Sequence, residues 1–334
     1  MERNNKKLKA VDIIKEALKI FSENINFTIF TSLISLPLFC FALYYETFLQ
    51  NFLQQTSDFF RSKENDDGFS SYNHYYYFNS NWFLPLDIVR KLNQDLFHDL
   101  AQLGFLYLVP LHLLELVTVF VTVDLASKIY REDMSLTFKD MFGIKTDRER
   151  LRGILVTYGY VVFLSTCTLL GFIWLLITYS DILRYFSAES DLDIFPSISS
   201  MALDACSHLV YGANLLLLIG IYLVWSAIWN LGLVISVLKA GTYGAKAIGS
   251  SAYLSLRNAR NGVILMLVFS IWGVGLRIPC LVFACYKSWG WMVARTSLFC
   301  LGNALKWVSF VVYFEDCVWR IFGKKVDVVE GQNL

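Results

Sequence analysis

Six long apolar runs constrain this sequence more than any other feature. They cover residues 27–49, 103–125, 153–179, 209–237, 262–285 and 293–314. A helix needs about 20 apolar residues to cross the hydrocarbon core of a bilayer, and each run is long enough to do so. The third and fourth runs contain no charged residue. The sequence therefore predicts an all-α polytopic membrane protein with six transmembrane helices.

Composition agrees with this class. Of the 334 residues, 56% are hydrophobic and 17% are charged, whereas about a quarter of the residues in a soluble domain are charged. The mean hydropathy is +0.48. No basic tract indicates a nucleic-acid partner. The expected partner of most of the chain is the lipid bilayer.

The distribution of lysine and arginine predicts the orientation. Twenty of these residues fall in the N-terminal segment, the second and fourth connections and the C-terminal segment, against six in the other connections. Cytosolic segments carry the excess of positive charge, so we expect both termini in the cytosol. We expect the first span to serve as the targeting signal. The membrane is the endoplasmic reticulum or the plasma membrane, because no terminal retention signal decides between them.

This orientation predicts three regions. Residues 1–26 form a cytosolic N-terminus, residues 27–320 the six-span domain with a long external loop at 50–102, and residues 321–334 a cytosolic tail. Amphipathic interfacial helices are expected on the cytosolic side. In residues 8–21, Val11, Ile14, Leu18 and Phe21 share one face and lysines the other, which is typical of an in-plane helix. Residues 83–101 predict a second such helix on the outer leaflet.

A threefold repeat is a further hypothesis. An amphipathic segment precedes each odd-numbered span, at residues 11–24, 135–144 and 243–258. The spacing of Ile13, Ala17 and Asn26 matches that of Ile248, Ala252 and Asn261. The repeating unit would be an in-plane helix followed by two spans.

Three stretches resemble a known family. They are AVDIIKEALKIFSENINFTIFTSLISLPLF from residue 10, the small-residue segment of residues 241–261, and VVYFEDCVWR from residue 311. They are similar to the membrane domain found beside bacterial glycerophosphodiester phosphodiesterases, and to plant six-span proteins of undefined function. The resemblance implies a membrane module rather than an enzyme, because the phosphodiesterase chemistry belongs to a separate soluble domain.

Polar residues inside the spans are the candidate functional residues, because ionisable groups there are costly. His112, Glu115, Thr118 and Thr122 make one stripe on the second span, and Asn303, Lys306 and Ser309 make another on the sixth. Glu115 and Lys306 lie about a dozen residues from the outer ends of their spans, at the same depth. We predict that they form an ion pair or a hydrogen-bonded contact near the midplane. Such a contact either serves the function or only fixes the packing of the helices.

Arg277 and Arg295 in the outer third of the last two spans complete the predicted polar network. With Glu46, His112, Asn214 and the prolines of the spans they could line an outward-facing vestibule. Alternatively, the two arginines and Glu46 extend to the outer interface. The seven cysteines show no CxxC spacing, so neither a disulfide framework nor a zinc site is expected. Cys317 is either a palmitoylation site or a buried small residue.

No set of residues indicates catalysis, a cofactor or a metal. The first hypothesis is therefore a non-enzymatic scaffold or regulatory component that meets a protein partner through its cytosolic helices. The second is a carrier or channel for a small solute, with an unknown ligand bound at the midplane polar stripe. An intramembrane lipid-modifying enzyme comes third, because it needs a convergent acid, base or nucleophile set.

Overall fold

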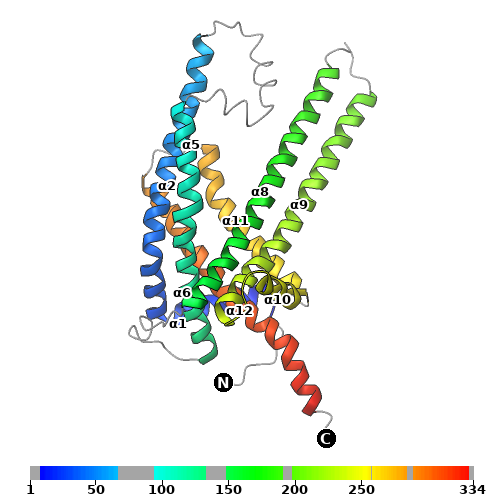
Figure 1. The fold of residues 1–334 in the computed structure, drawn as a ribbon. Coiled ribbons are helices and arrows are strands. Elements are labelled where there is room, and N and C mark those ends of the chain that lie inside the picture. The colour runs from blue at the N-terminus through cyan, green and yellow to red at the C-terminus, as the bar shows by residue number, and fades with distance from the viewer. Residues whose placement is uncertain are drawn as a thin grey trace. The chain divides into compact units, whose positions relative to one another are not determined.

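A computed structural model describes residues 8–66, 94–132, 148–190, 198–256, 258–283 and 289–330. Every regular element in these ranges is helical, which confirms the all-α class. The elements are α1 (Ala10–Glu23), α2 (Ile25–Asp66), α5 (Gln94–Leu106), the π-helix η1 (Tyr107–Leu111), α6 (His112–Glu132), α8 (Arg148–Ser190), α9 (Ile198–Leu238), α10 (Ala245–Leu256), α11 (Ala259–Phe283) and α12 (Trp289–Glu330) (Figure 1).

Six helices in this part of the chain are long and apolar enough to cross a membrane, as the sequence predicts. The candidate spans are Ile25–Phe52, His98–Arg131, Arg148–Leu175, Leu209–Leu238, Ala259–Leu276 and Trp289–Ile321. Large apolar side chains on them remain outward, and Trp174 and Leu216 are each 71% exposed. Apolar surface on that scale requires lipid or a partner to cover it. The protein is a polytopic helical membrane protein.

The chain divides into two compact units. Unit 1 comprises Met1–Leu33, Thr118–Ile278 and Leu301–Leu334, and unit 2 comprises Ile34–Val117 and Pro279–Cys300. The boundaries fall inside α2, α6, α11 and α12. The predicted regions 1–26, 27–320 and 321–334 follow expected membrane boundaries instead, and they stay predictions.

In unit 1, α10 packs against both helices of the α8–α9 hairpin. The ring of Tyr243 occupies the space where a side chain on Gly153 would begin, so only glycine allows this approach. Gly244 has a φ of +58°, a left-handed conformation that glycine adopts without strain. Its N–H donates to Thr157 Oγ1 at 2.7 Å. These contacts fix the loop that leads into α10.

The core of unit 1 lies around the end of α9 and the middle of α12. Its side chains are almost completely buried and interlock as those of protein interiors do. They include Leu231, Leu233, Val234 and Ile235 on α9 and Val308, Phe310, Val311 and Phe314 on α12. This apolar core supports the polar clusters described below.

Two short helices each lead into a span. Asn24 separates α1 from α2, and Asn258 directly precedes α11. On α1 the buried residues are Ala10, Ile13, Ala17 and Ile20, and on α10 they are Ala247, Ser251, Leu254 and Ser255. If the helices are matched by burial and by the two asparagines, Ile13 corresponds to Ala247. This match differs by one residue from the predicted match of Ile13 with Ile248, and the repeat stays a prediction. Residues 135–144, the third proposed copy, lie outside the described residues.

In α1 the residues that pack against the protein lie on the flank of the predicted apolar face, not at its centre. Val11 and Leu18 are 60% and 50% exposed, whereas Ile13 and Ala17 are fully buried. The smaller Ala17 allows the helix to lie close to its neighbours, and the larger apolar residues point outward. The apolar face that is predicted to lie in the membrane interface is therefore not the side that packs against the protein, and its place at a membrane stays a prediction.

Unit 2 contains α5, η1 and the first residues of α6, up to Val117, as one continuous helical run. The backbone stays right-handed helical on both sides of η1, at Leu106 and His112. Residues 94–101 thus belong to one continuous helical run with the second candidate span, which begins at His98, and not to a separate helix as predicted. Residues 83–93 lie outside the described residues. Pro110 lies inside η1, and a proline that removes a helical hydrogen bond is a common cause of such an irregularity.

Candidate functional site

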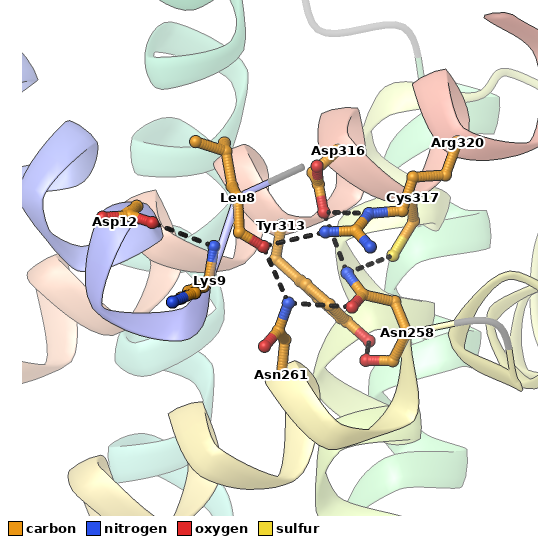
Figure 2. Close-up of polar contacts among 9 residues, drawn as sticks. All are labelled: Leu8, Lys9, Asp12, Asn258, Asn261, Tyr313, Asp316, Cys317 and Arg320. Atoms are coloured by element: carbon orange, nitrogen blue, oxygen red, sulfur yellow. Dashed lines mark hydrogen bonds and ion pairs between the residues drawn. The ribbon is translucent and has the colours of Figure 1, made fainter. Parts of the chain in front are cut away.

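Polar side chains in unit 1 gather where the start of α1, the α10–α11 junction and α12 meet (Figure 2). We call this group the junction cluster. It consists of Leu8, Asn258, Asn261, Tyr313, Asp316, Cys317 and Arg320. Segments from both ends of the chain contribute to it, so it ties together parts of the sequence that are far apart.

Asp316 and Arg320 form an ion pair one turn apart on α12. Arg320 Nε donates to Asp316 Oδ2 at 2.7 Å, and the side chains are 16% and 4% exposed. The i,i+4 spacing places both on the same face of the helix. A buried carboxylate without a partner is strongly destabilising, so Arg320 makes the burial of Asp316 tolerable.

Asn258 occupies the centre of the cluster and is 7% exposed. Its side-chain amide donates to Asp316 at 2.9 Å and to Cys317 Sγ at 3.8 Å. Its Oδ1 accepts from Asn261 at 2.8 Å, and its backbone carbonyl accepts from the Tyr313 hydroxyl at 3.1 Å. Each polar atom of this side chain therefore has a protein partner, as buried polar groups generally do.

The carbonyl oxygen of Leu8 brings the N-terminal segment into the cluster. It accepts from Arg320 Nη2 at 2.8 Å and from Asn261 Nδ2 at 2.9 Å. The next residue, Lys9, donates its backbone N–H to Asp12 Oδ2 at 3.1 Å, which satisfies one of the unpaired donors at the start of α1. The beginning of α1 is thus fastened to both α11 and α12.

Apart from Cys317, none of these residues is among the candidates that the sequence indicates, although two of the stretches quoted for the family resemblance, 241–261 and the one from residue 311, meet here. Asp316 offered the clearest signal, because it is a carboxylate among apolar residues near the end of a span, with Arg320 one turn later. Cys317 is 1% exposed, which favours the buried-residue interpretation over palmitoylation.

A second buried ion pair in unit 1 joins α6, α8 and α9. Asp124 is 4% exposed and contacts Lys128 Nζ at 2.8 Å and Arg150 Nη2 at 2.9 Å. Arg150 Nε also donates to the carbonyl oxygen of Val237 at 3.1 Å. One guanidinium thus connects three helices, using the fork of donors that lysine lacks.

The structure brings together two predicted residues in unit 2. His112 Nδ1 lies 3.5 Å from Glu115 Oε2, and the side chains are 19% and 28% exposed. The ring of Tyr107 meets the His112 ring edge-on, with 5.0 Å between centroids. The pair begins directly after η1, and π-helical turns inside α-helices are frequent at functional sites.

Arg295 contacts Glu46, a residue named with it in the predicted vestibule. It is 7% exposed and forms an ion pair with Glu46 within unit 2. The vestibule and the outer-interface alternatives for Arg295 both stay predictions, and its buried position beside Glu46 is compatible with either. The side chain of Arg277 lies outside the described residues.

The remaining predicted residues lie on α12 in unit 1. Asn303 Oδ1 accepts a hydrogen bond from Trp307 Nε1 at 3.1 Å. The ammonium of Lys306 lies over the Trp307 ring, 4.4 Å from its centroid, a favourable arrangement for a cation. Glu115 belongs to unit 2, so its ion pair with Lys306 stays a prediction.

The polar clusters in unit 1 hold helices together. Their carboxylates are neutralised by arginine or lysine, and their amides bond to carbonyl or carboxylate oxygens. Among the described residues, no three histidine, cysteine or acidic side chains are placed to hold a metal ion. No family model, curated protein or solved structure matches this chain.

Proposed function

We propose that the protein is a non-enzymatic scaffold of a membrane, with a rigid unit 1 that holds α10 as a fixed surface for a partner protein. The junction cluster is the observation that carries this proposal. The charged and amide groups of the cluster bind one another and so connect three helices. These helices therefore resist movement relative to one another. A transport path or a catalytic centre needs polar groups that remain accessible to a solute or substrate.

The exposed side of α10 is the surface we assign to the partner. Lys246, Gly249, Tyr253 and Leu256 follow one another at steps of three, four and three and are all exposed. This spacing makes one stripe along a helix. Tyr253 is 63% exposed and Leu256 is 76% exposed. An aromatic and an aliphatic side chain beside a cation are typical of the anchors that partner proteins bind.

We infer the membrane and the orientation from the charge distribution. The excess of lysine and arginine on one side favours a cytosolic location for α1, α10 and both chain ends. The hydrogen bond between Arg320 and Leu8 joins the N-terminal segment to the end of the last span. It therefore supports the inference that both chain ends lie on the same side of the membrane. The membrane is that of the endoplasmic reticulum or the plasma membrane.

A carrier for a small solute is the second candidate, and the His112–Glu115 pair favours it. The pair is half-buried and follows a π-helical turn in a candidate span. Ionisable side chains at such positions mark solute or proton pathways in membrane proteins. In this function the rigid unit 1 would serve as the frame and unit 2 would contain the binding site.

Native mass spectrometry of the protein extracted gently in its own lipid tests the scaffold. We expect a stoichiometric protein partner that the Tyr253→Ala/Leu256→Ala variant loses and the control Leu216→Ala/Leu217→Ala variant keeps. The control residues are exposed on α9 and are 71% and 63% accessible. A small molecule bound in place of a protein, and lost when Glu115→Gln and Lys306→Met are combined, would overturn the scaffold and support the carrier.

A further inference from the structure

The surface of α1 is divided into sectors around the helix axis. Ala10, Ile13, Ala17 and Ile20 are buried on one side. On another side Val11, Lys15, Leu18 and Ser22 are exposed at steps of four, three and four, which makes one stripe. Val11 and Leu18 are large apolar residues in that stripe, and both are at least half exposed. The stripe therefore presents apolar and basic side chains together.

The lysines form a border between the apolar and the acidic parts of α1. At 3.6 residues per turn, Lys15 and Lys19 follow Val11 and Leu18 around the axis. Asp12, Glu16 and Glu23 come next, farther from the apolar side chains. Lys19 has only a loose contact with Glu23, at 3.9 Å with both side chains about half exposed or more. Exposed pairs of this kind bind weakly, so the ammonium group remains available to a stronger anion.

The position of α1 at the membrane boundary follows from its attachment to α2. Only Asn24 separates α1 from the first span. Thr28 Oγ1 on α2 donates back to the carbonyl oxygen of Phe21 at 2.7 Å. At its other end, Arg320 and Asn261 hold the carbonyl oxygen of Leu8. Because α1 is fixed at both ends, its exposed stripe has one orientation.

We propose that the exposed stripe of α1 binds the phosphate headgroup of an anionic phospholipid in the adjacent leaflet. Val11 and Leu18 enter the boundary between acyl chains and headgroups, as the apolar faces of interfacial helices do. The stems of Lys15 and Lys19 cross this apolar layer and place two ammonium groups at the phosphate. The acidic sector faces the aqueous side. This lipid site is independent of the scaffold proposal, which concerns α10.

Titration of the detergent-solubilised full chain with phosphatidylglycerol, followed by native mass spectrometry, tests the site. Phosphatidylcholine is the neutral reference lipid. The Lys15→Gln/Lys19→Gln variant should bind phosphatidylglycerol at least tenfold more weakly, since each lysine near an anionic headgroup contributes about fivefold. Its affinity for phosphatidylcholine should not change. Both side chains are exposed, so we expect the variant to fold, and its melting temperature verifies this.

The matched control is Lys324→Gln/Lys325→Gln, which removes the same charge after the end of the last candidate span at Ile321. It should bind phosphatidylglycerol as the unaltered chain does. An equal loss of binding in the control would overturn the site in favour of general electrostatic attraction. Unchanged binding by the α1 variant would also overturn it. A second variant, Leu18→Gln, should weaken the binding of both lipids if the apolar anchor is in place.

Discussion

Arg320 donates a hydrogen bond to the carbonyl oxygen of Leu8 at 2.8 Å, and so joins the last span to the residue that precedes the first helix. The same guanidinium binds Asp316 at 2.7 Å. Two acceptors of different kinds, a peptide carbonyl and a carboxylate, are thus served by one side chain. Only arginine has a planar fork of donors that suits this arrangement, which leads to the first prediction.

The Arg320→Lys substitution should destabilise the protein although it keeps the charge. One ammonium group is unable to reach both acceptors, so one buried oxygen loses its donor, at a cost of about 1–3 kcal/mol. We expect a lower melting temperature in detergent, followed by intrinsic tryptophan fluorescence. Arg260→Lys is the control, because Arg260 is exposed near the start of α11. Equal melting of the Arg320→Lys variant and the unaltered chain would contradict the role assigned to Arg320.

The spans could be predicted from the sequence because the signal is additive over about 20 residues. A single misjudged residue does not alter such a sum. The outer part of the second span was harder, because the spacing of Leu96 and Leu100 fits both an in-plane helix and a prolonged span. Periodicity describes which residues share a face, whereas the direction of the helix depends on the continuous backbone through Leu106.

The polar clusters were less predictable because partners in them come from distant segments. His112 and Glu115 are three residues apart, so helical spacing alone predicts their contact. Arg295 and Glu46 are far apart in sequence, and periodicity does not pair them. Leu8 joins the junction cluster only through its backbone carbonyl, which every residue has. No side-chain pattern predicts a contact of that kind.

Gly262 is one position in unit 1 where we expect a small substitution to have a clear cost. A Cβ atom there would lie 2.8 Å from the Tyr313 hydroxyl oxygen and 3.1 Å from Tyr313 Cζ. Both distances are too short, and Tyr313 is fully buried, so its ring has little room to shift. Gly262→Ala should destabilise by about 1–3 kcal/mol, the usual cost of overpacking, measured as a lower melting temperature.

Two variants verify that the clash is with Tyr313. Gly249→Ala is the control, because no atom lies within 4 Å of the added Cβ in α10, and alanine there should stabilise by up to about 1 kcal/mol. Tyr313→Phe removes the nearest atom, so Gly262→Ala should cost less in that background than alone. If the two substitutions cost the same together as the sum of their separate effects, another contact is responsible.

We expect that two apolar residues can replace the ion pair between Glu46 and Arg295, whereas removal of only one of its charges destabilises the protein. Arg295→Leu alone leaves the carboxylate of Glu46, only 24% exposed, without this partner, and breaking a buried pair costs about 3–5 kcal/mol. Glu46→Leu/Arg295→Leu removes both charges and should recover most of that loss. The measurement is the melting temperature of each variant. A double variant as unstable as Arg295→Leu would show that the pair contributes packing rather than compensation of charge.

The predicted ion pair between Glu115 and Lys306 has a direct test in a charge exchange. Glu115→Lys and Lys306→Glu should each reduce the yield of folded protein, because each leaves two like charges near the middle of the spans. The two substitutions together should restore the yield, measured by fluorescence-detected gel filtration. A double variant with no better yield than the single variants would show that the two residues do not pair.

Substitution of His112 distinguishes the predicted pair of Glu115 with Lys306 from the contact of Glu115 with His112 in unit 2. If His112, 3.5 Å away, stabilises the carboxylate of Glu115, then His112→Leu in the otherwise unaltered chain should lower the yield of folded protein. In the exchanged background residue 115 is a lysine, so the carboxylate that contacts His112 is absent. His112→Leu should then have no effect or raise the yield. A loss of the same size in both backgrounds would indicate that His112 acts through packing near η1, independently of the charge at position 115.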